Sequence, residues 1–198
     1  MSSDRGTVSD VDDMADGLVD GLVDGVVDGV VRDDQHVVLV GLMGAGKSTV
    51  GRMLAERLHR PLYDSDQMVE ARTGRTVREI FANDGEPVFR ALEAEALADA
   101  LVSTTPSVIA AAGGAVLSEA NRQLLRAANA KVVWLRADPA VLVERVQSAG
   151  HRPLLDDDPP AVLRQMADTR EPLYREVADV IVTVAGRSPH EVVEAVLR

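Results

Sequence analysis

The segment GLMGAGKST, residues 41 to 49, has the spacing G-x-x-x-x-G-K-[ST] and directly follows a run of β-branched residues. In such a loop the glycines let backbone N–H groups converge on phosphate oxygens, and the start of the next helix adds partial positive charge. Lys47 is placed to reach the terminal phosphates, and Ser48 to ligate Mg²⁺. The remaining nucleotide contacts are expected from Gly44, Ala45, Gly46 and Thr49. The loop predicts ATP or GTP binding, but does not separate a kinase from a hydrolase, a switch or a motor.

Two carboxylates, Asp64 and Asp66, follow in YDSD, after an expected second strand. Ligands of open parallel sheets gather at the carboxyl ends of the strands, so both acids are expected near the phosphate loop. They could serve Mg²⁺ and the hydroxyl of an acceptor. Alternatively, Asp64 or Ser65 could simply cap the helix that begins near Asp66.

Three further features each have a purely structural interpretation. Arg90 has Glu86 at i−4 and Glu93 at i+3, the spacing of a solvated salt-bridge face. The segment AAGGAV, 111 to 116, ends a strand in paired glycines, which permit close approach to a ligand or a tight turn. Arg170, taken alone, is expected at the surface.

Composition limits the classes of protein that fit. At 198 residues and 46% hydrophobic content, the chain has the size of one domain with one sizeable core. It has no cysteine and four scattered histidines, which argues against disulfides and a zinc site. No apolar run approaches the roughly 18 residues of a membrane span, and the N-terminus lacks the features of a secretory signal. We therefore expect a cytoplasmic protein that does not bind a membrane.

The net charge of −11 is distributed unevenly. Residues 1 to 34 contain ten Asp, no Glu and two Arg, which gives −8 and leaves −3 for the rest of the chain. No basic stripe of the kind that binds nucleic acid is present. Within this tail, residues 17 to 31 read GLVDGLVDGVVDGVV, in which a helix would carry four costly glycines and repelling aspartates at i, i+4. We expect residues 1 to 34 to be a disordered extension, with a partner-docking or metal-related role as the alternatives.

From His36 onward, short β-branched runs alternate with amphipathic segments. Strands are expected at 36 to 40, up to 64, 107 to 112, 131 to 135 and 179 to 184. Helices are expected at 47 to 59, 66 to 72, 76 to 83, 86 to 102, 118 to 128, 139 to 148, 160 to 177 and from about Pro189. This alternation implies right-handed crossovers and hence an α/β fold, a three-layer αβα sandwich around a parallel five-stranded sheet. The broken polar segment 149 to 160 is expected to be a mobile lid, framed by Arg145 and Arg152.

Together these motifs resemble the shikimate kinase family of small P-loop kinases. The resemblance runs from about Val37 to the C-terminus and assigns residues 35 to 198 to one domain of the P-loop nucleoside-monophosphate-kinase type. Its strongest block, DSDQMVEARTGRTVREIFANDGEPVFRALE, is similar to the family's D-[ST]-D, R-T-G, I-F and G-E-x-x-F-R-x-x-E pattern. GGAV, RPLL and REPLY follow in the family's order.

The resemblance implies ATP-dependent phosphorylation of the 3-hydroxyl of shikimate, which yields shikimate 3-phosphate and ADP in the biosynthesis of chorismate and aromatic amino acids. It implies that Asp66 holds the acceptor hydroxyls, and that Arg90 and Arg170 bind the shikimate carboxylate. Gly113 and Gly114 would approach the acceptor through their backbone. One Mg²⁺ per subunit would be ligated directly by Ser48 and through water by Asp64.

The same resemblance makes Lys47, Asp66 and Arg152 the expected catalytic residues. Phosphoryl transfer passes through a loose transition state, so alignment and charge neutralisation matter more than a strong base. ATP would also be contacted by Arg145, Arg152 and Arg187. ATP and shikimate are the expected partners of a monomer that binds no nucleic acid.

One departure from the family pattern is Ala112, which stands where the family usually has glycine. If this position required a positive φ, alanine would cost on the order of 1 kcal/mol. Two other functions remain open at this stage. One is another small-molecule P-loop kinase, such as a gluconate kinase, and the other is a noncatalytic nucleotide switch.

Overall fold

A computed structural model describes residues 30–148 and 158–198. Most of the repeat of residues 17 to 31, most of the predicted tail, Arg152 and most of the predicted lid lie outside the described residues. The domain boundaries and the lid therefore stay predictions.

Five parallel strands form one sheet in the order β2-β3-β1-β4-β5. The central strand β1 (His36–Val40) pairs with β3 (Val108–Ala110) and β4 (Ala130–Arg136), while β2 (Leu62–Asp64) and β5 (Val180–Thr183) form the edges. All of β1 is buried, as expected for a strand covered on both faces. The parallel sheet predicted from the alternating pattern is confirmed.

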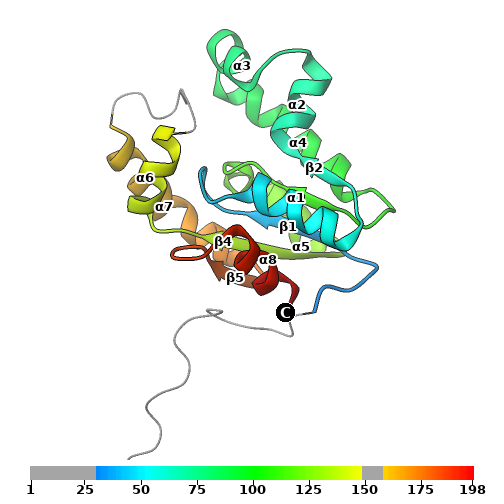
Figure 1. Cartoon of the computed structure of the whole chain (residues 1–198). Coiled ribbons are helices and arrows are strands. Elements are labelled where there is room, and N and C mark those ends of the chain that lie inside the picture. Colours follow the sequence, from blue (N-terminus) through cyan, green and yellow to red (C-terminus); the bar gives the residue numbers. More distant parts are fainter. Residues whose placement is uncertain (1–29, 149–157) are drawn as a thin grey trace, which may run out of the picture.

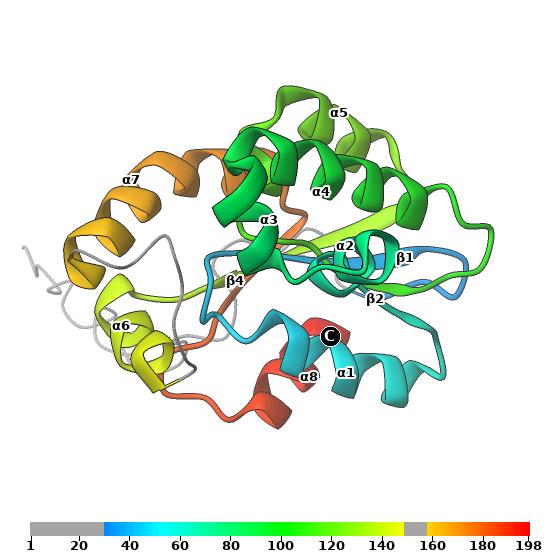
Figure 2. The same ribbon diagram turned by 90° about the horizontal axis from the view of Figure 1, so that it is seen from above.

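Helices cover both faces of this sheet. Figure 2 shows α1 and α8 on one side of the sheet and α4, α5 and α7 on the other. The helices are α1 (Lys47–Leu58), α2 (Ser65–Thr73), α3 (Val77–Asp84), α4 (Glu86–Leu101), α5 (Glu119–Ala127), α6 (Pro139–Ser148), α7 (Pro159–Val177) and α8 (Pro189–Leu197), with a 3₁₀ helix η1 (Ala115–Leu117). The predicted three-layer α/β sandwich is thus confirmed, whereas η1 was not predicted from the sequence.

Residues 65–101 form a lobe of three helices, here called the α2–α4 lobe, that stands above the carboxyl ends of the strands in Figure 1. It has a small core of its own, made of Val69, Ile80, Phe89 and Ala96. Helix α3 begins with a capping box, in which Thr76 accepts from the backbone N–H of Glu79 and the Glu79 side chain accepts from that of Thr76. This packing and capping fix the helices that face the phosphate loop.

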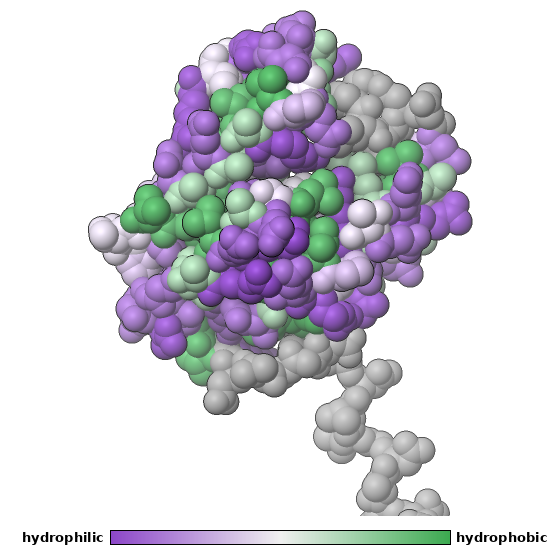
Figure 3. Space-filling view, turned by 180° about the vertical axis from the view of Figure 1, so that it is seen from behind, coloured by the Kyte–Doolittle hydropathy of each residue, from purple (hydrophilic) through white to green (hydrophobic). Residues whose placement is uncertain are grey.

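One face of the molecule is mainly hydrophilic. Figure 3 shows hydrophilic residues over most of the face seen from behind, with hydrophobic residues scattered between them. Among the described residues, no helix is both long and apolar enough to cross a membrane.

Candidate active site

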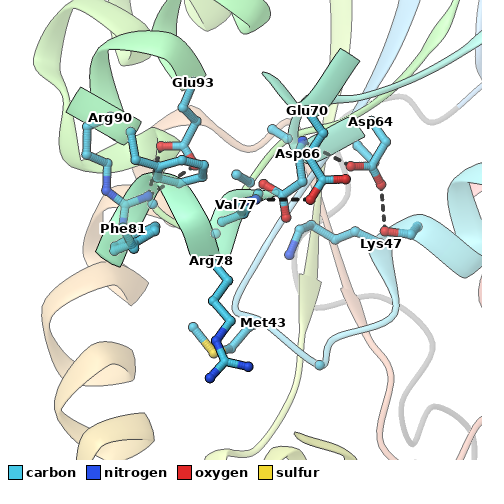
Figure 4. A pocket seen from close by; sticks show the side chains of 18 of the residues that line it. Met43, Lys47, Asp64, Asp66, Glu70, Val77, Arg78, Phe81, Arg90 and Glu93 are labelled. Carbon is cyan, nitrogen blue, oxygen red and sulfur yellow. Dashed lines mark hydrogen bonds and ion pairs between the residues drawn. The ribbon is translucent and has the colours of Figure 1, made fainter. Parts of the chain in front are cut away.

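A cavity of about 590 Å³ lies at the carboxyl ends of the strands, between the phosphate loop and the α2–α4 lobe (Figure 4). Most of the site residues predicted from the sequence line it. They are Gly44, Gly46, Lys47, Ser48, Thr49, Asp64, Asp66, Arg90, Gly113, Gly114, Arg145 and Arg170. Segments far apart in the chain therefore contribute to one site.

The phosphate loop adopts a backbone that only glycine accommodates easily. Gly41 has φ +140°, and a Cβ there would lie 2.5 Å from the carbonyl oxygen of Leu135. Gly46, with φ +94°, is the N-cap of α1 and leaves the first N–H groups of this helix directed at the loop. The Lys47 ammonium donates to the carbonyl oxygens of Gly41 and Leu42, at 2.7 and 3.0 Å. Its positive charge thus lies along the loop.

Asp64 combines two tasks that the sequence presented as alternatives. One carboxylate oxygen caps α2 by accepting from the backbone N–H of Asp66 at 3.1 Å. The other accepts from the Ser48 hydroxyl at 2.7 Å (Figure 4). Adjacent hydroxyl and carboxylate oxygens are hard donors of the kind that Mg²⁺ prefers, with phosphates and waters completing its shell. Within the described residues, no cluster of three or more His, Cys, Asp or Glu could hold a metal by itself. The pair therefore fits a Mg²⁺ ion that arrives with a nucleotide.

Arg90 forms both salt bridges that its spacing predicted, but it does not lie on a solvated face. Its Nη2 donates to Glu86 at 2.8 Å, and its Nη1 donates to the two oxygens of Glu93 at 2.9 and 3.1 Å. The side chain of Glu93 is only 1% exposed, and Arg90 faces the cavity.

The pKa shifts of Glu93 and Arg90 reflect the burial of this pair. Burial raises the pKa of Glu93, and the attraction of Arg90 lowers it less than burial raises it. Burial alone would lower the pKa of Arg90, but Glu93 and Glu86 together raise it. Arg90 is thus a permanently charged group held in a defined orientation.

The paired glycines lie in a tight turn and also allow close approach of neighbouring groups. The Ala115 N–H donates to the carbonyl oxygen of Ala112 at 3.0 Å, which closes the turn over Gly113 and Gly114. Gly114 has φ −94°, yet a Cβ there would overlap the Arg90 guanidinium and lie 2.7 Å from its Nη2. A Cβ on Gly113 would lie 3.3 Å from the carbonyl oxygen of Gly41, against the phosphate loop. In the described residues His59 alone among non-glycines has a positive φ, so the conformational cost considered for Ala112 does not arise.

Arg170 is buried, so its placement at the surface from the sequence alone is wrong. It is 6% exposed, and its Nη1 donates to the carbonyl oxygen of Gly113 at 3.2 Å. The Tyr174 hydroxyl donates to the same oxygen at 2.6 Å, while the Tyr174 ring packs against Trp134 with 5.6 Å between the ring centroids. Because peptides are planar and trans, this anchoring directs the N–H of Gly114 away from α7.

Tyr174 was not singled out from the sequence, and Ser65 was considered only as a possible helix cap, a position that Asp64 occupies. Ser65, 2% exposed, accepts from the backbone N–H of Ala112 at 2.7 Å and donates to the carbonyl oxygen of Ala110 at 3.3 Å. It therefore ties the start of α2 to the end of β3. The i, i+4 spacing of Arg170 and Tyr174, which places both on one helix face, was the signal available for Tyr174.

The structure does not bring every predicted residue into the cavity. Arg187 lies in the loop between β5 and α8, where its Nη1 donates to the carbonyl oxygen of Thr183 at 3.0 Å. Ala45 is a buried residue of the phosphate loop, and its N–H donates to the carbonyl oxygen of Leu42 at 3.2 Å. Neither lines the cavity. Arg145 reaches it from α6.

The close packing of Gly114 against Arg90 generates a first prediction. Gly114→Ala forces the guanidinium out of its position, so binding of shikimate, the acceptor that the resemblance implies, should weaken about tenfold or more, while ATP binding changes little. Ala112→Gly is the matched control and should leave the dissociation constant for shikimate unchanged. Calorimetric titration with each ligand checks both variants, and undiminished shikimate binding by Gly114→Ala would contradict the assignment.

A second prediction concerns the Tyr174 hydroxyl. Burial raises its pKa, so it remains a hydrogen-bond donor at neutral pH. Tyr174→Phe keeps the ring packing but leaves Arg170 as the only donor to the Gly113 carbonyl oxygen among the described residues. We therefore expect a three- to tenfold higher KM for shikimate, which corresponds to a loss of roughly 1 kcal/mol in binding free energy. The KM for ATP and the melting temperature should change little. A purely structural tyrosine would instead lower the melting temperature and affect both substrates alike.

Comparison with known proteins agrees with this geometry. A family model described as shikimate kinase matches residues 43–198. The chain is 47% identical over 165 residues to the shikimate kinase of Symbiobacterium thermophilum, covering 82% of this chain and 94% of that protein. It is 45% identical over 163 residues to the shikimate kinase of Pseudomonas paraeruginosa, with the same coverage.

Solved structures show the same likeness. The structure of shikimate kinase from Acinetobacter baumannii in complex with shikimate superposes with a TM-score of 0.78 at 36% identity, covering 82% of this chain and 90% of that one. A gluconokinase from Sinorhizobium meliloti has a TM-score of 0.61 at 24% identity, covering 84% and 91%, and shares the fold. On the family model and these identities, the chain belongs to the shikimate kinase family.

Proposed function

We propose that this protein is an ATP-dependent shikimate kinase, which transfers the γ-phosphoryl group of ATP to the 3-hydroxyl of shikimate. The observation that carries the proposal is that one cavity has two chemically different ends. Lys47, Ser48 and Asp64 form an end suited to phosphates and Mg²⁺, and Arg90 and Arg170 form an end suited to a carboxylate. Membership of the family supports the same conclusion.

At the phosphate end, the chain supplies positive charge and a fixed backbone. Lys47 and the N-terminus of α1 offset the negative charge of the terminal phosphates. Ser48 would hold Mg²⁺ directly and Asp64 through water. When bound, the ion neutralises charge that develops on the phosphate oxygens.

At the acceptor end, Asp66 is the residue that selects the hydroxyl. It lies half-buried in the first turn of α2, where a helix N-terminus favours a carboxylate, and it lines the cavity with Arg90. Accepting the hydroxyl proton in a hydrogen bond aligns the oxygen with the γ-phosphorus. The oxygen–phosphorus bond then forms as the bond to ADP breaks, and the hydroxyl proton passes to Asp66 or to water. The transition state is loose, so orientation contributes more than basicity.

The remaining predicted roles are part of the same proposal. Arg145 and Arg187 contact ATP, and Arg152 on a lid at 149 to 160 closes over the phosphates, which keeps water from the γ-phosphoryl group. We infer a monomer in the cytoplasm, with ATP and shikimate as its substrates and one Mg²⁺ per subunit.

Coupled measurement of ADP release tests the proposal. Shikimate should stimulate turnover in the presence of Mg²⁺ and ATP, and chelation of Mg²⁺ should abolish it. Turnover stimulated by gluconate instead would identify another small-molecule kinase. ATP binding without stimulation by either acceptor would identify a nucleotide switch.

The site assignment generates a third prediction. Asp66→Asn and Arg90→Ala should each lower kcat/KM for shikimate at least about a hundredfold, because each removes a group that aligns the acceptor, while ATP binding is largely kept. Arg72→Ala is a matched control, since Arg72 also lies in the α2–α4 lobe but pairs with Asp99 outside the cavity. Near-normal activity of both site variants would show the assignment to be wrong.

A further inference from the structure

The charge of the α2–α4 lobe opposes the binding of an anion. Residues 65–101 contain four arginines and eight carboxylates, in a protein whose total charge is −11. The proposed acceptor carries a carboxylate, and like charges lower the local concentration of a diffusing ligand. Efficient capture of the acceptor therefore requires positive charge at the entrance of the cavity.

Three of the four arginines in this lobe are neutralised by ion pairs. Arg72 pairs with Asp99 and Arg75 with Asp84, each at 2.6 Å. Arg90 pairs with both Glu86 and Glu93. Arg78 differs, because it makes no hydrogen bond or ion pair with any residue in the described part of the chain.

Arg78 nevertheless lies in a defined place. It lines the cavity from the first turn of α3, is exposed, and extends toward Met43 of the phosphate loop in Figure 4. The helix that carries it is anchored by the capping box of Thr76 and Glu79. A second anchor is the bond from the backbone N–H of Val77 to the Glu70 carboxylate, at 3.0 Å. The charge is thus held at the mouth of the cavity although its side chain is solvated.

Resting on the proposed function, we propose that Arg78 is an acceptor-recognition residue, whose positive charge draws the carboxylate of shikimate into the cavity. Arg90 and Arg170 then hold the bound carboxylate deeper in the site. Because Arg78 is exposed, its attraction acts through solvent and is screened by salt. Its contribution should therefore be modest and dependent on ionic strength. It should act on kcat/KM for the acceptor and leave kcat unchanged.

The test measures steady-state kinetics of the full chain with saturating ATP and Mg²⁺, at about 20 mM and about 500 mM ionic strength. The variants are Arg78→Ala, Arg78→Lys and Arg75→Ala, the last being a cation one turn away that Asp84 already neutralises. A second acceptor, the methyl ester of shikimate, presents the same ring and hydroxyls without the negative charge.

For Arg78→Ala we expect kcat/KM for shikimate to fall about three- to fivefold at low ionic strength and to approach the unsubstituted value at high ionic strength. Arg78→Lys and Arg75→Ala should stay close to the unsubstituted protein, and no variant should change kcat/KM for the methyl ester. An equal loss with the ester, or a loss that salt does not reduce, would show that Arg78 acts by packing and overturn the inference.

Three other results would also contradict it. A higher KM for ATP without any change in kcat/KM for shikimate would show that Arg78 interacts with the nucleotide. If Arg78→Ala leaves kcat/KM for shikimate unchanged in an active enzyme, this inference alone is overturned. If the unsubstituted protein does not turn over shikimate, the proposed function is overturned and the inference with it.

Discussion

The buried pairing of Arg90 with Glu93 organises the acceptor end of the cavity. A carboxylate that is 1% exposed is costly unless its partner stays in place, so Arg90 is confined to one orientation. That orientation fills the space directly against Gly114, where no side chain fits. Arg90, Glu93 and Gly114 thus depend on one another, and a change in any of them moves the group that faces the acceptor.

The loop after β3, which contacts Arg90 at Gly114, connects the acceptor end to the nucleotide end. Gly113 packs against the backbone of the phosphate loop, and its carbonyl oxygen is held by Arg170 and Tyr174 from α7. Ser65 ties the neighbouring Ala112 to the start of α2, next to Asp66. The phosphate loop, the acceptor hydroxyl site and the carboxylate site therefore keep a fixed spacing. Phosphoryl transfer depends chiefly on such alignment.

The local patterns predicted most of the fold, because strand and helix periodicities are properties of short segments. The phosphate loop was equally accessible, since its glycines serve a local backbone geometry. Arg170 was misplaced, because burial by packing of α7 against the loop after β3 is a tertiary effect that no local pattern records. Gly114 was predicted as a site residue, but the reason that it must be glycine was not. That reason is the position of the Arg90 side chain, not a backbone angle that only glycine can adopt. The roles of Tyr174, Ser65 and Arg78 were not predicted, for the same reason. Tyr174 and Ser65 bond to segments distant in the chain, and Arg78 has no partner among the described residues, which no local pattern shows.

The role of the Arg90–Glu93 pair is tested most directly by calorimetric titration of shikimate into Glu93→Gln, with ATP titration and thermal unfolding to confirm that the variant is folded. Loss of the carboxylate releases Arg90 from its fixed orientation, so we expect shikimate to bind about tenfold more weakly, a loss of roughly 1.4 kcal/mol in binding free energy, with ATP binding unchanged. If Glu93 instead competes with the acceptor for the Arg90 charge, its removal leaves shikimate binding equal or tighter. That result would contradict the central role of the pair.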